Sequence, residues 1–291
     1  MLFRSPNGLI FDEFTAILGG EPLGEALPVR YIYRKAKEKA AAEGAFTLEL
    51  TASFEVTGNP ADLGPLSLVL EQPDRFSVSL NGAPIEVPAE RDWLVQEALQ
   101  LIPLAGVRSG TNQLILKCQF EATSDLENAY LAGQFGVSEA PFRLVSAPSE
   151  LVPGSFAAQG LPFYAGSLTC SFRLQLAEKP AEGRIILELG RLRDAATVKV
   201  GGQVVDTVLW APFEVDVTEY VQAGANEFSV EVAGDLFNFY GPHHHPAGVS
   251  AGRDPGGWDF PIEQYQKGYT IDEFGLLEAP KLVLELRRGA N

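Results

Sequence analysis

Apolar side chains recur at every second position through much of the second half of the chain. The clearest run covers 168–176, where the apolar positions are Leu168, Cys170, Phe172, Leu174 and Leu176. The same period returns at 185–189 and 228–232. Successive side chains of a strand point to opposite faces, so this period predicts strands with one buried face. Gly201-Gly202 between two apolar runs predicts a tight hairpin. The segment 166–232 therefore predicts an antiparallel β-sandwich.

A similar alternation of apolar positions is present in the chain before residue 166. Alternating apolar positions occupy 46–56, 66–70 and 76–80, and the last run leads into Asn81-Gly82, a strong signal for a two-residue hairpin. The motif V-x-x-G-x-N appears at 107–112 and again at 221–226, each time directly before an alternating strand. This internal repeat predicts two tandem jelly-roll sandwiches.

These observations predict an all-β protein with three segments. Residues 1–45 are expected to form a linker with a helix, 46–145 the first sandwich and 146–291 the second. The helix is expected from Tyr31 to Ala42, where good helix formers and basic residues follow one another. A second short helix is expected from Trp93 to Leu99.

The order of these elements resembles the galactose-binding-like jelly roll, in particular the sugar-binding domain of glycoside hydrolase family 2. Three short stretches extend the resemblance to the C-terminal region of α-L-rhamnosidase-type enzymes of family 106. They are YLAGQFGV at 130–137, PFYAG at 162–166 and NFYGPHH at 238–244. The resemblance implies a carbohydrate-binding accessory module for a rhamnose- or galactose-containing glycan, with a catalytic barrel on a separate partner chain.

No part of the sequence alternates strands with the helices that a (β/α)8 barrel needs. The 38 acidic residues include no pair that its context marks as the two carboxylates of a glycosidase. We therefore expect no hydrolysis by this chain alone. Two alternatives stay open, a structural or protein-interaction module and a glycoside hydrolase with a site near His243 to His245.

Composition limits the class of partner. The net charge of −16 argues against nucleic acid, because binding to phosphate backbones needs clustered Lys and Arg. No apolar run is long enough to span a bilayer. The N-terminus lacks the apolar core of a secretory signal, so a cytoplasmic location is expected if the chain is intact.

The sequence contains little that indicates a metal or cofactor site. Cys118 and Cys170 both lie in alternating runs, which favours free core thiols over a disulfide, and no CxxC pair suggests zinc. We expect no cofactor. Oxygen-rich loops could hold a structural Ca²⁺, although the D-x-D-x-D-G pattern is absent.

The segment 238–258 and one further loop supply the candidate ligand-binding residues. Sugar rings stack on aromatic planes while their hydroxyls need polar partners. For His243 to His245, hydrogen bonding within a buried turn and metal ligation are alternatives, although adjacent side chains of an extended chain diverge. For the tryptophans, core packing is the alternative. The candidates are Asn238, Tyr240, His243, His244, Asp254, Trp258 and Trp210.

Overall fold

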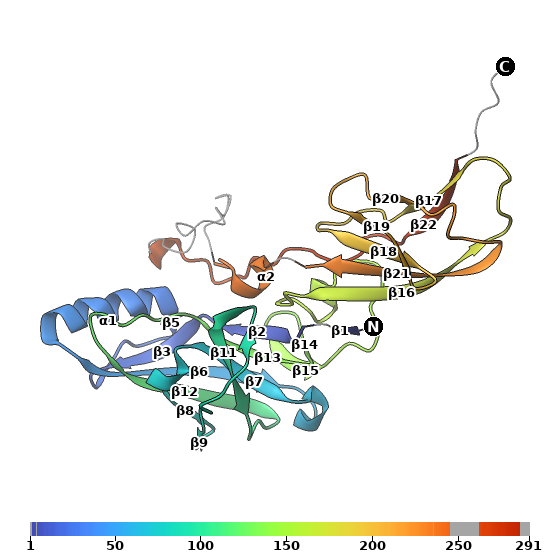
Figure 1. Cartoon of the computed structure of the whole chain (residues 1–291). Coiled ribbons are helices and arrows are strands. Elements are labelled where there is room, and N and C mark those ends of the chain that lie inside the picture. Colours follow the sequence, from blue (N-terminus) through green and yellow to red (C-terminus); the bar gives the residue numbers. More distant parts are fainter. Residues whose placement is uncertain (1, 4, 235, 245–261, 286–291) are drawn as a thin grey trace. The chain divides into compact units, whose positions relative to one another are not determined.

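The computed structural model describes residues 2–3, 5–234, 236–244 and 262–285 (Figure 1). The chain forms two compact units. Unit 1 comprises 1–6, 148–238 and 271–291, and unit 2 comprises 7–147 and 239–270. These units differ from the segments expected from the sequence in two respects. The N-terminal segment after residue 6 belongs to unit 2, and so does 239–270.

Unit 2 contains two sheets, both mostly antiparallel. The first has the order β10-β11-β7-β13-β2, with β10 (Trp93–Leu94), β11 (Gln96–Leu104), β7 (Leu66–Glu71), β13 (Ala129–Gly133) and β2 (Asn7–Phe11). The second follows β14-β15-β6-β12-β8-β9, with β14 (Phe135–Val137), β15 (Arg143–Ser146), β6 (Phe46–Val56), β12 (Gly110–Phe120), β8 (Ser77–Leu80) and β9 (Ala83–Ile85). In this second sheet β15 runs parallel to β6.

The alternation read from the sequence is present in these strands. In β6 the apolar side chains of Phe46, Leu48, Leu50, Ala52, Phe54 and Val56 are all buried. Strands β8 and β9 are joined by the turn Asn81-Gly82. Both turn residues have a positive φ, 53° and 82°, as a type I′ hairpin requires. The predicted hairpin is confirmed.

The first 45 residues are more than a linker. After β2, the strand β3 (Glu13–Leu18) pairs with β6, and the short strands β4 (Glu21–Pro22) and β5 (Leu27–Pro28) pair with β3. Helix α1 (Val29–Glu43) confirms the predicted helix and buries Val29, Ile32, Ala36 and Ala40 along one face. Strand β2 is buried at every position, so its sequence carries no alternation that would have marked it as a strand.

The helix expected at 93–99 is absent. Residues Trp93–Leu94 and Gln96–Leu104 are strands β10 and β11, and Val95 between them has a φ of 66°. The run Gln96-Glu97-Ala98-Leu99 favours helix locally, but Leu99 to Leu104 pair with β7. Cross-strand pairing has outweighed the intrinsic preference.

Unit 1 is a sandwich of a five-stranded and a three-stranded sheet. The larger has the order β1-β16-β21-β18-β19, with β1 (Leu2–Phe3), β16 (Ser167–Leu176), β21 (Gly224–Ala233), β18 (Ala196–Val200) and β19 (Gln203–Val208). The smaller is β20-β17-β22, with β20 (Glu214–Asp216), β17 (Arg184–Glu188) and β22 (Lys281–Glu285). Ile185 and Leu187 of the small sheet share one core with Val198 and Val230 of the large one. Gly201-Gly202 forms the predicted hairpin between β18 and β19.

The repeated V-x-x-G-x-N motif has the same local structure in both units. The Asn226 side chain accepts from the backbone N–H of Gln222 at 2.9 Å and donates to the carbonyls of Gln222 at 2.8 Å and Gly224 at 3.2 Å. In unit 2 Asn112 makes the matching bonds to Arg108 and Gly110. Both asparagines are buried, so one side chain satisfies three backbone groups that would otherwise be desolvated without partners.

Replacing Asn226 with alanine is expected to lower the free energy of unfolding of unit 1 by about 2 kcal/mol, because three buried backbone groups lose their partner. Asn226→Asp, which keeps the acceptor and loses both donated bonds, should also destabilise unit 1. Gln222→Ala leaves the backbone bonds intact and serves as the matched control. Urea denaturation of the three variants measures the effect. Equal stability of Asn226→Ala and the control would contradict this role.

The described part of the chain is poor in helix. Besides α1 it holds only the four-residue helix α2 (Phe237–Tyr240) and short 3-10 turns. Within the described residues no helix is long and apolar enough to cross a membrane. Cys118 and Cys170 are free thiols, as expected.

Candidate functional site

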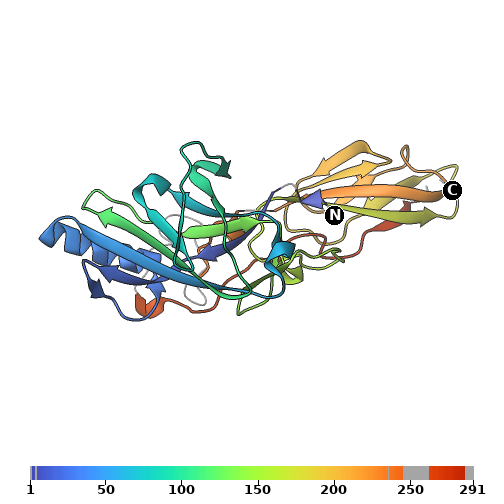
Figure 2. The ribbon, with the colours of Figure 1, turned by 90° about the horizontal axis from the view of Figure 1, so that it is seen from below.

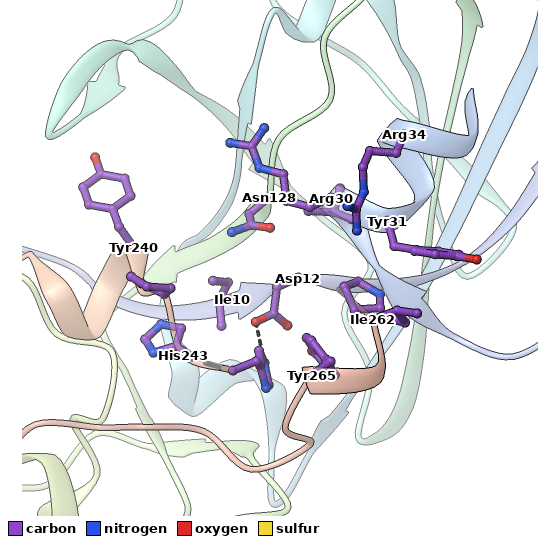
Figure 3. A pocket seen from close by; sticks show the side chains of 14 residues that line it. Ile10, Asp12, Arg30, Tyr31, Arg34, Asn128, Tyr240, His243, Ile262 and Tyr265 are labelled. Carbon is purple, nitrogen blue, oxygen red and sulfur yellow. Dashed lines mark hydrogen bonds and ion pairs between the residues drawn. The ribbon is translucent and has the colours of Figure 1, made fainter. Parts of the chain in front are cut away.

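A pocket in unit 2 brings together the N-terminal elements and the segment that follows α2. Segment 262–270 lies beside the N-terminal elements of unit 2 in both views of the ribbon (Figures 1 and 2). The open volume is about 560 Å³, solvent at its mouth included. Its lining combines apolar, aromatic and charged side chains (Figure 3). They are Ile10, Asp12, Pro28, Val29, Arg30, Tyr31, Arg34, Asn128, Tyr240, Pro242, His243, His244, Ile262 and Tyr265.

Asp12 and His244 form a buried pair on one side of this pocket. His244 Nε2 lies 2.9 Å from Asp12 Oδ2, and the Tyr269 hydroxyl donates to Asp12 Oδ1 at 2.7 Å. His244 Nδ1 lies 2.7 Å from the carbonyl oxygen of Gln266. The imidazole also stacks on the ring of Tyr265 and contacts that of Tyr269 edge-on, with centroid distances of 4.5 and 4.3 Å.

These contacts raise the pKa of His244. The Gln266 carbonyl can only accept, so Nδ1 must carry a proton. The other nitrogen, Nε2, faces Asp12 Oδ2 at 2.9 Å, an oxygen to which a protonated Nε2 can donate. Burial by itself would lower the pKa of His244, but the hydrogen bond to Asp12, its negative charge, the Gln266 carbonyl and the charge of Glu13 together raise it above its usual value. The contacts therefore favour the protonated imidazolium of His244.

Two arginines reach the pocket from α1. Arg30 and Arg34 are one helical turn apart, so they share a face of the helix. Arg30 contacts Glu127 Oε1 at 2.9 Å. Burial raises the pKa of Glu127 to about 7, with Asp125 and Glu71 adding to the shift and Arg30 opposing it. Arg34 lies 5.9 Å from the ring centroid of Tyr31.

Three of the expected site residues line the pocket, namely Tyr240, His243 and His244. The Tyr240 ring stands edge-on to Tyr130 and burial raises its pKa to about 12. His243 pairs with Thr270, whose N–H donates to the His243 carbonyl at 2.9 Å and whose carbonyl lies 3.1 Å from His243 Nδ1. For both histidines the described contacts match the hydrogen-bonded buried turn considered in the sequence analysis.

Two of the other expected residues, Asn238 and Trp210, do not line this pocket. Asn238 belongs to unit 1, where its buried amide exchanges two hydrogen bonds of 2.8 Å with the backbone of Asp272. Trp210, also in unit 1, is 74% exposed. His245, Asp254 and Trp258 lie outside the described residues. Among the residues that the structure describes, no three His, Cys, Asp or Glu side chains form a group that could hold a metal ion.

Sequence reasoning missed Asp12, Arg30, Arg34, Asn128 and Tyr265. The only local signal was the spacing of the two arginines by four positions within a predicted helix, which places them on one face. Asp12 carried none. Its partner His244 is 232 positions away in the sequence, and only the folded chain makes the pair visible.

No family model matches the sequence, and no curated protein matches it. Solved structures with a similar course of the chain include a rhamnosidase from Novosphingobium sp. PP1Y, at 20% identity over 82% of this chain and 21% of that one, with a TM-score of 0.32. Another is the α-L-rhamnosidase of Streptomyces avermitilis complexed with L-rhamnose, at 16% identity over 69% of this chain and 22% of that one, with a TM-score of 0.31.

A β-D-mannosidase from Dictyoglomus thermophilum is similar at 9% identity over 83% of this chain and 32% of that one, with a TM-score of 0.32. The chain thus spans about a fifth of the length of the two rhamnosidases and about a third of the mannosidase. At these TM-scores the likeness supports no inference about activity or ligand.

Proposed function

We propose that this chain is a carbohydrate-binding accessory module without a hydrolytic site of its own, and that the pocket of unit 2 is its ligand site. The observation that carries the proposal is the composition of the pocket lining. The lining contains the aromatic rings of Tyr31 and Tyr265 and the hydrogen-bond donors of Arg30, Arg34 and Asn128. Sugars present apolar C–H faces and polar edges, and a site for them needs both kinds of group.

The contacts of the titratable groups favour binding over hydrolysis. A general base needs a free lone pair, but both ring nitrogens of His244 are engaged in hydrogen bonds with Gln266 and Asp12. Both oxygens of Asp12 accept hydrogen bonds within the protein. Neither group is arranged to exchange a proton with a substrate, which supports the accessory role over a glycosidase centred on the histidines.

A glycan panel tests the proposal, with affinities of the best ligands then measured by calorimetry. Tyr31→Ala is expected to weaken binding about tenfold, because the ring that would face the sugar is removed. Trp93→Ala is the matched control, since Trp93 is an aromatic side chain of the same unit, is 52% exposed and does not line the pocket. Its affinity should equal that of the wild type.

Two results would count against this function. Absence of binding across the panel, together with a stable complex formed with another protein, would favour the interaction-module alternative. Turnover of an aryl α-L-rhamnoside that is lost when one Asp or Glu is replaced would show that the chain is an enzyme.

A further inference from the structure

We propose that unit 1 associates with a second copy of this chain through the outer edge of β16, and that the two β16 strands pair antiparallel about a two-fold axis at Leu174. This inference is independent of the proposed function and concerns a strand of unit 1 that does not line the pocket of unit 2. It follows from the open length of the strand, the apolar side chains beside that edge and the charges along it.

The outer edge of β16 is open over most of its length. β16 is a strand of 10 residues that pairs with β21 on one side along its whole length, without a shift of register. On its other side the described residues provide only β1, which pairs with Leu168 and Thr169 (Figure 1). The stretch from Ser171 to Leu176 therefore presents backbone N–H and C=O groups that no described strand pairs with. Such an edge is a template for one more strand.

The other sheet edges of unit 1 have features that oppose such pairing, and β16 has none of them. At the opposite edge of the larger sheet, β19 contains the exposed Asp206, and its ladder with β18 has a shift of register. In the smaller sheet, β20 is only 3 residues long, and β22 begins at the exposed Lys281 and ends at the exposed Glu285. Charges, bulges and short length all protect an edge. By contrast, β16 is long and regular, contains no proline, and has Arg173 as its only charged residue.

The apolar side chains of β16 are incompletely covered along this open stretch. Cys170, Phe172 and Leu174 pack against the core of unit 1, but each of them is only partly buried. A strand added to the edge would lay its own inward side chains beside them. Burial of this apolar surface would favour the association of a second strand.

A second copy of β16 suits this edge when the two strands pair about Leu174. Leu174 then lies opposite its own copy, Phe172 lies opposite Leu176 of the second copy, and Arg173 lies opposite Gln175 of the second copy. Paired residues of neighbouring antiparallel strands point to the same face. The apolar side chains therefore meet on the core side and the polar ones on the outer side. The shared stretch ends before the two residues that β1 covers.

The neighbouring registers are less favourable. Pairing about Arg173 would set two guanidinium groups directly opposite each other, and like charges in that position are destabilising. Pairing about Phe172 would run the second copy into the residues that β1 already covers. Pairing about Gln175 would engage only 174–176 within the strand. The register at Leu174 is therefore the one that combines length with compatible side chains.

The charges along the shared stretch permit the contact. Arg173 forms an ion pair with Glu227 of its own chain at 2.5 Å, so the single charge of β16 is balanced within unit 1. Each chain has a net charge of −16, and two copies therefore repel each other at long range. A locally neutral edge allows close approach at this place, and added salt should screen the remaining repulsion.

Sedimentation equilibrium of the full chain over a series of concentrations tests the inference. We expect a reversible dimer whose affinity increases with added salt. Gln175→Arg should weaken the dimer about tenfold, because two-fold symmetry sets the new guanidinium opposite Arg173 twice. Gln175→Glu should strengthen it, because a carboxylate then faces Arg173. Gln203→Arg is the matched control, since Gln203 is also exposed and lies on β19 at the other edge of the same sheet. It makes the same change of charge and should weaken the dimer far less than Gln175→Arg.

Disulfide cross-linking tests the register. Cys170→Ser first removes the native thiol nearest to the edge. In that background, Arg173→Cys mixed with Gln175→Cys should give a disulfide-linked dimer on oxidation, because directly opposite positions have Cβ atoms about 5 Å apart. Ser171→Cys alone should give none, since its two copies would lie about 20 Å apart along the strands. Thermal melts show that each variant is folded.

Each other outcome counts against the inference. A chain that stays monomeric at every concentration up to about 1 mM overturns it. A dimer that Gln175→Arg and Gln203→Arg weaken equally, or that neither weakens, overturns the assignment to β16. Cross-linking of Ser171→Cys with itself, without cross-linking of the mixed pair, overturns the register at Leu174. None of these results bears on carbohydrate binding by unit 2.

Discussion

Asp12→Ala is expected to destabilise unit 2 by about 3–5 kcal/mol, the cost of removing one partner of a buried ion pair. His244 and Asp12 are only 6% and 8% exposed. Without the carboxylate, His244 Nε2 loses its buried partner and the Tyr269 hydroxyl loses its acceptor. Urea denaturation measures the loss. A decrease below about 1 kcal/mol would show that the pair contributes little to stability.

Asp12→Asn is the matched control, because an amide can replace the carboxylate without a charge. The Asn Nδ2 can donate to Nε2 of a neutral His244, and its Oδ1 can accept from Tyr269, so every hydrogen bond survives. We expect this variant to be far more stable than Asp12→Ala. Buried ion pairs can often be replaced by neutral groups of the same shape at small cost.

The pair of Asp12 and His244 should make the stability of the protein depend on pH, and the raised pKa of His244 determines the sign of that dependence. A group whose pKa is higher in the folded state contributes its full stabilisation at pH values below its pKa in the unfolded state, here near 6.5. It loses this stabilisation as the pH rises through its pKa in the folded state. The wild type should therefore lose stability as the pH is raised above about 6.5. Asp12→Asn should not show this loss. A wild-type stability that rises over the same range would contradict the raised pKa of His244.

Gly275→Ala is expected to destabilise unit 1 by about 3 kcal/mol. Gly275 has a φ of 110°, and an added Cβ would lie 2.5 Å from Cδ2 of the Phe156 ring. Phe156 has little freedom to move, since it is 1% exposed, packs edge-on against Phe274 at 5.7 Å and donates its backbone N–H to the Phe274 carbonyl. The cost combines overpacking of about 1–3 kcal/mol with the strain of a positive φ, about 1–2 kcal/mol.

Gly202→Ala separates these two contributions. Gly202 has a φ of 86°, and nothing lies within 4 Å of the position of an added Cβ. It should therefore show the backbone strain alone, about 1–2 kcal/mol. Hydrogen exchange of unit 1 peptides, measured beside urea denaturation, locates the loss. Equal destabilisation by the two substitutions would show that contact with Phe156 adds nothing.

Local patterns were sufficient to predict most of the secondary structure. Two-residue alternation identified strands such as Phe46–Val56 and Ser167–Leu176, and the hairpins at Asn81-Gly82 and Gly201-Gly202 followed from residues that tolerate positive φ. The V-x-x-G-x-N repeat marked two loops with the same hydrogen bonds. Each of these features is specified by residues within a few positions of one another, which is why a sequence displays them.

The sequence by itself determined an all-β chain, a helix from Tyr31 to Ala42, which the structure places at Val29–Glu43, and the repeated asparagine loops. These features depend on short-range periodicity and backbone geometry. Tertiary structure alone decided that β2 pairs with β13, that segment 239–270 joins the N-terminal unit, and that Asp12 meets His244. Such contacts depend on the order of strands within the sheets. That order is selected by the free energy of the whole packed core, and no local pattern of apolar residues encodes it.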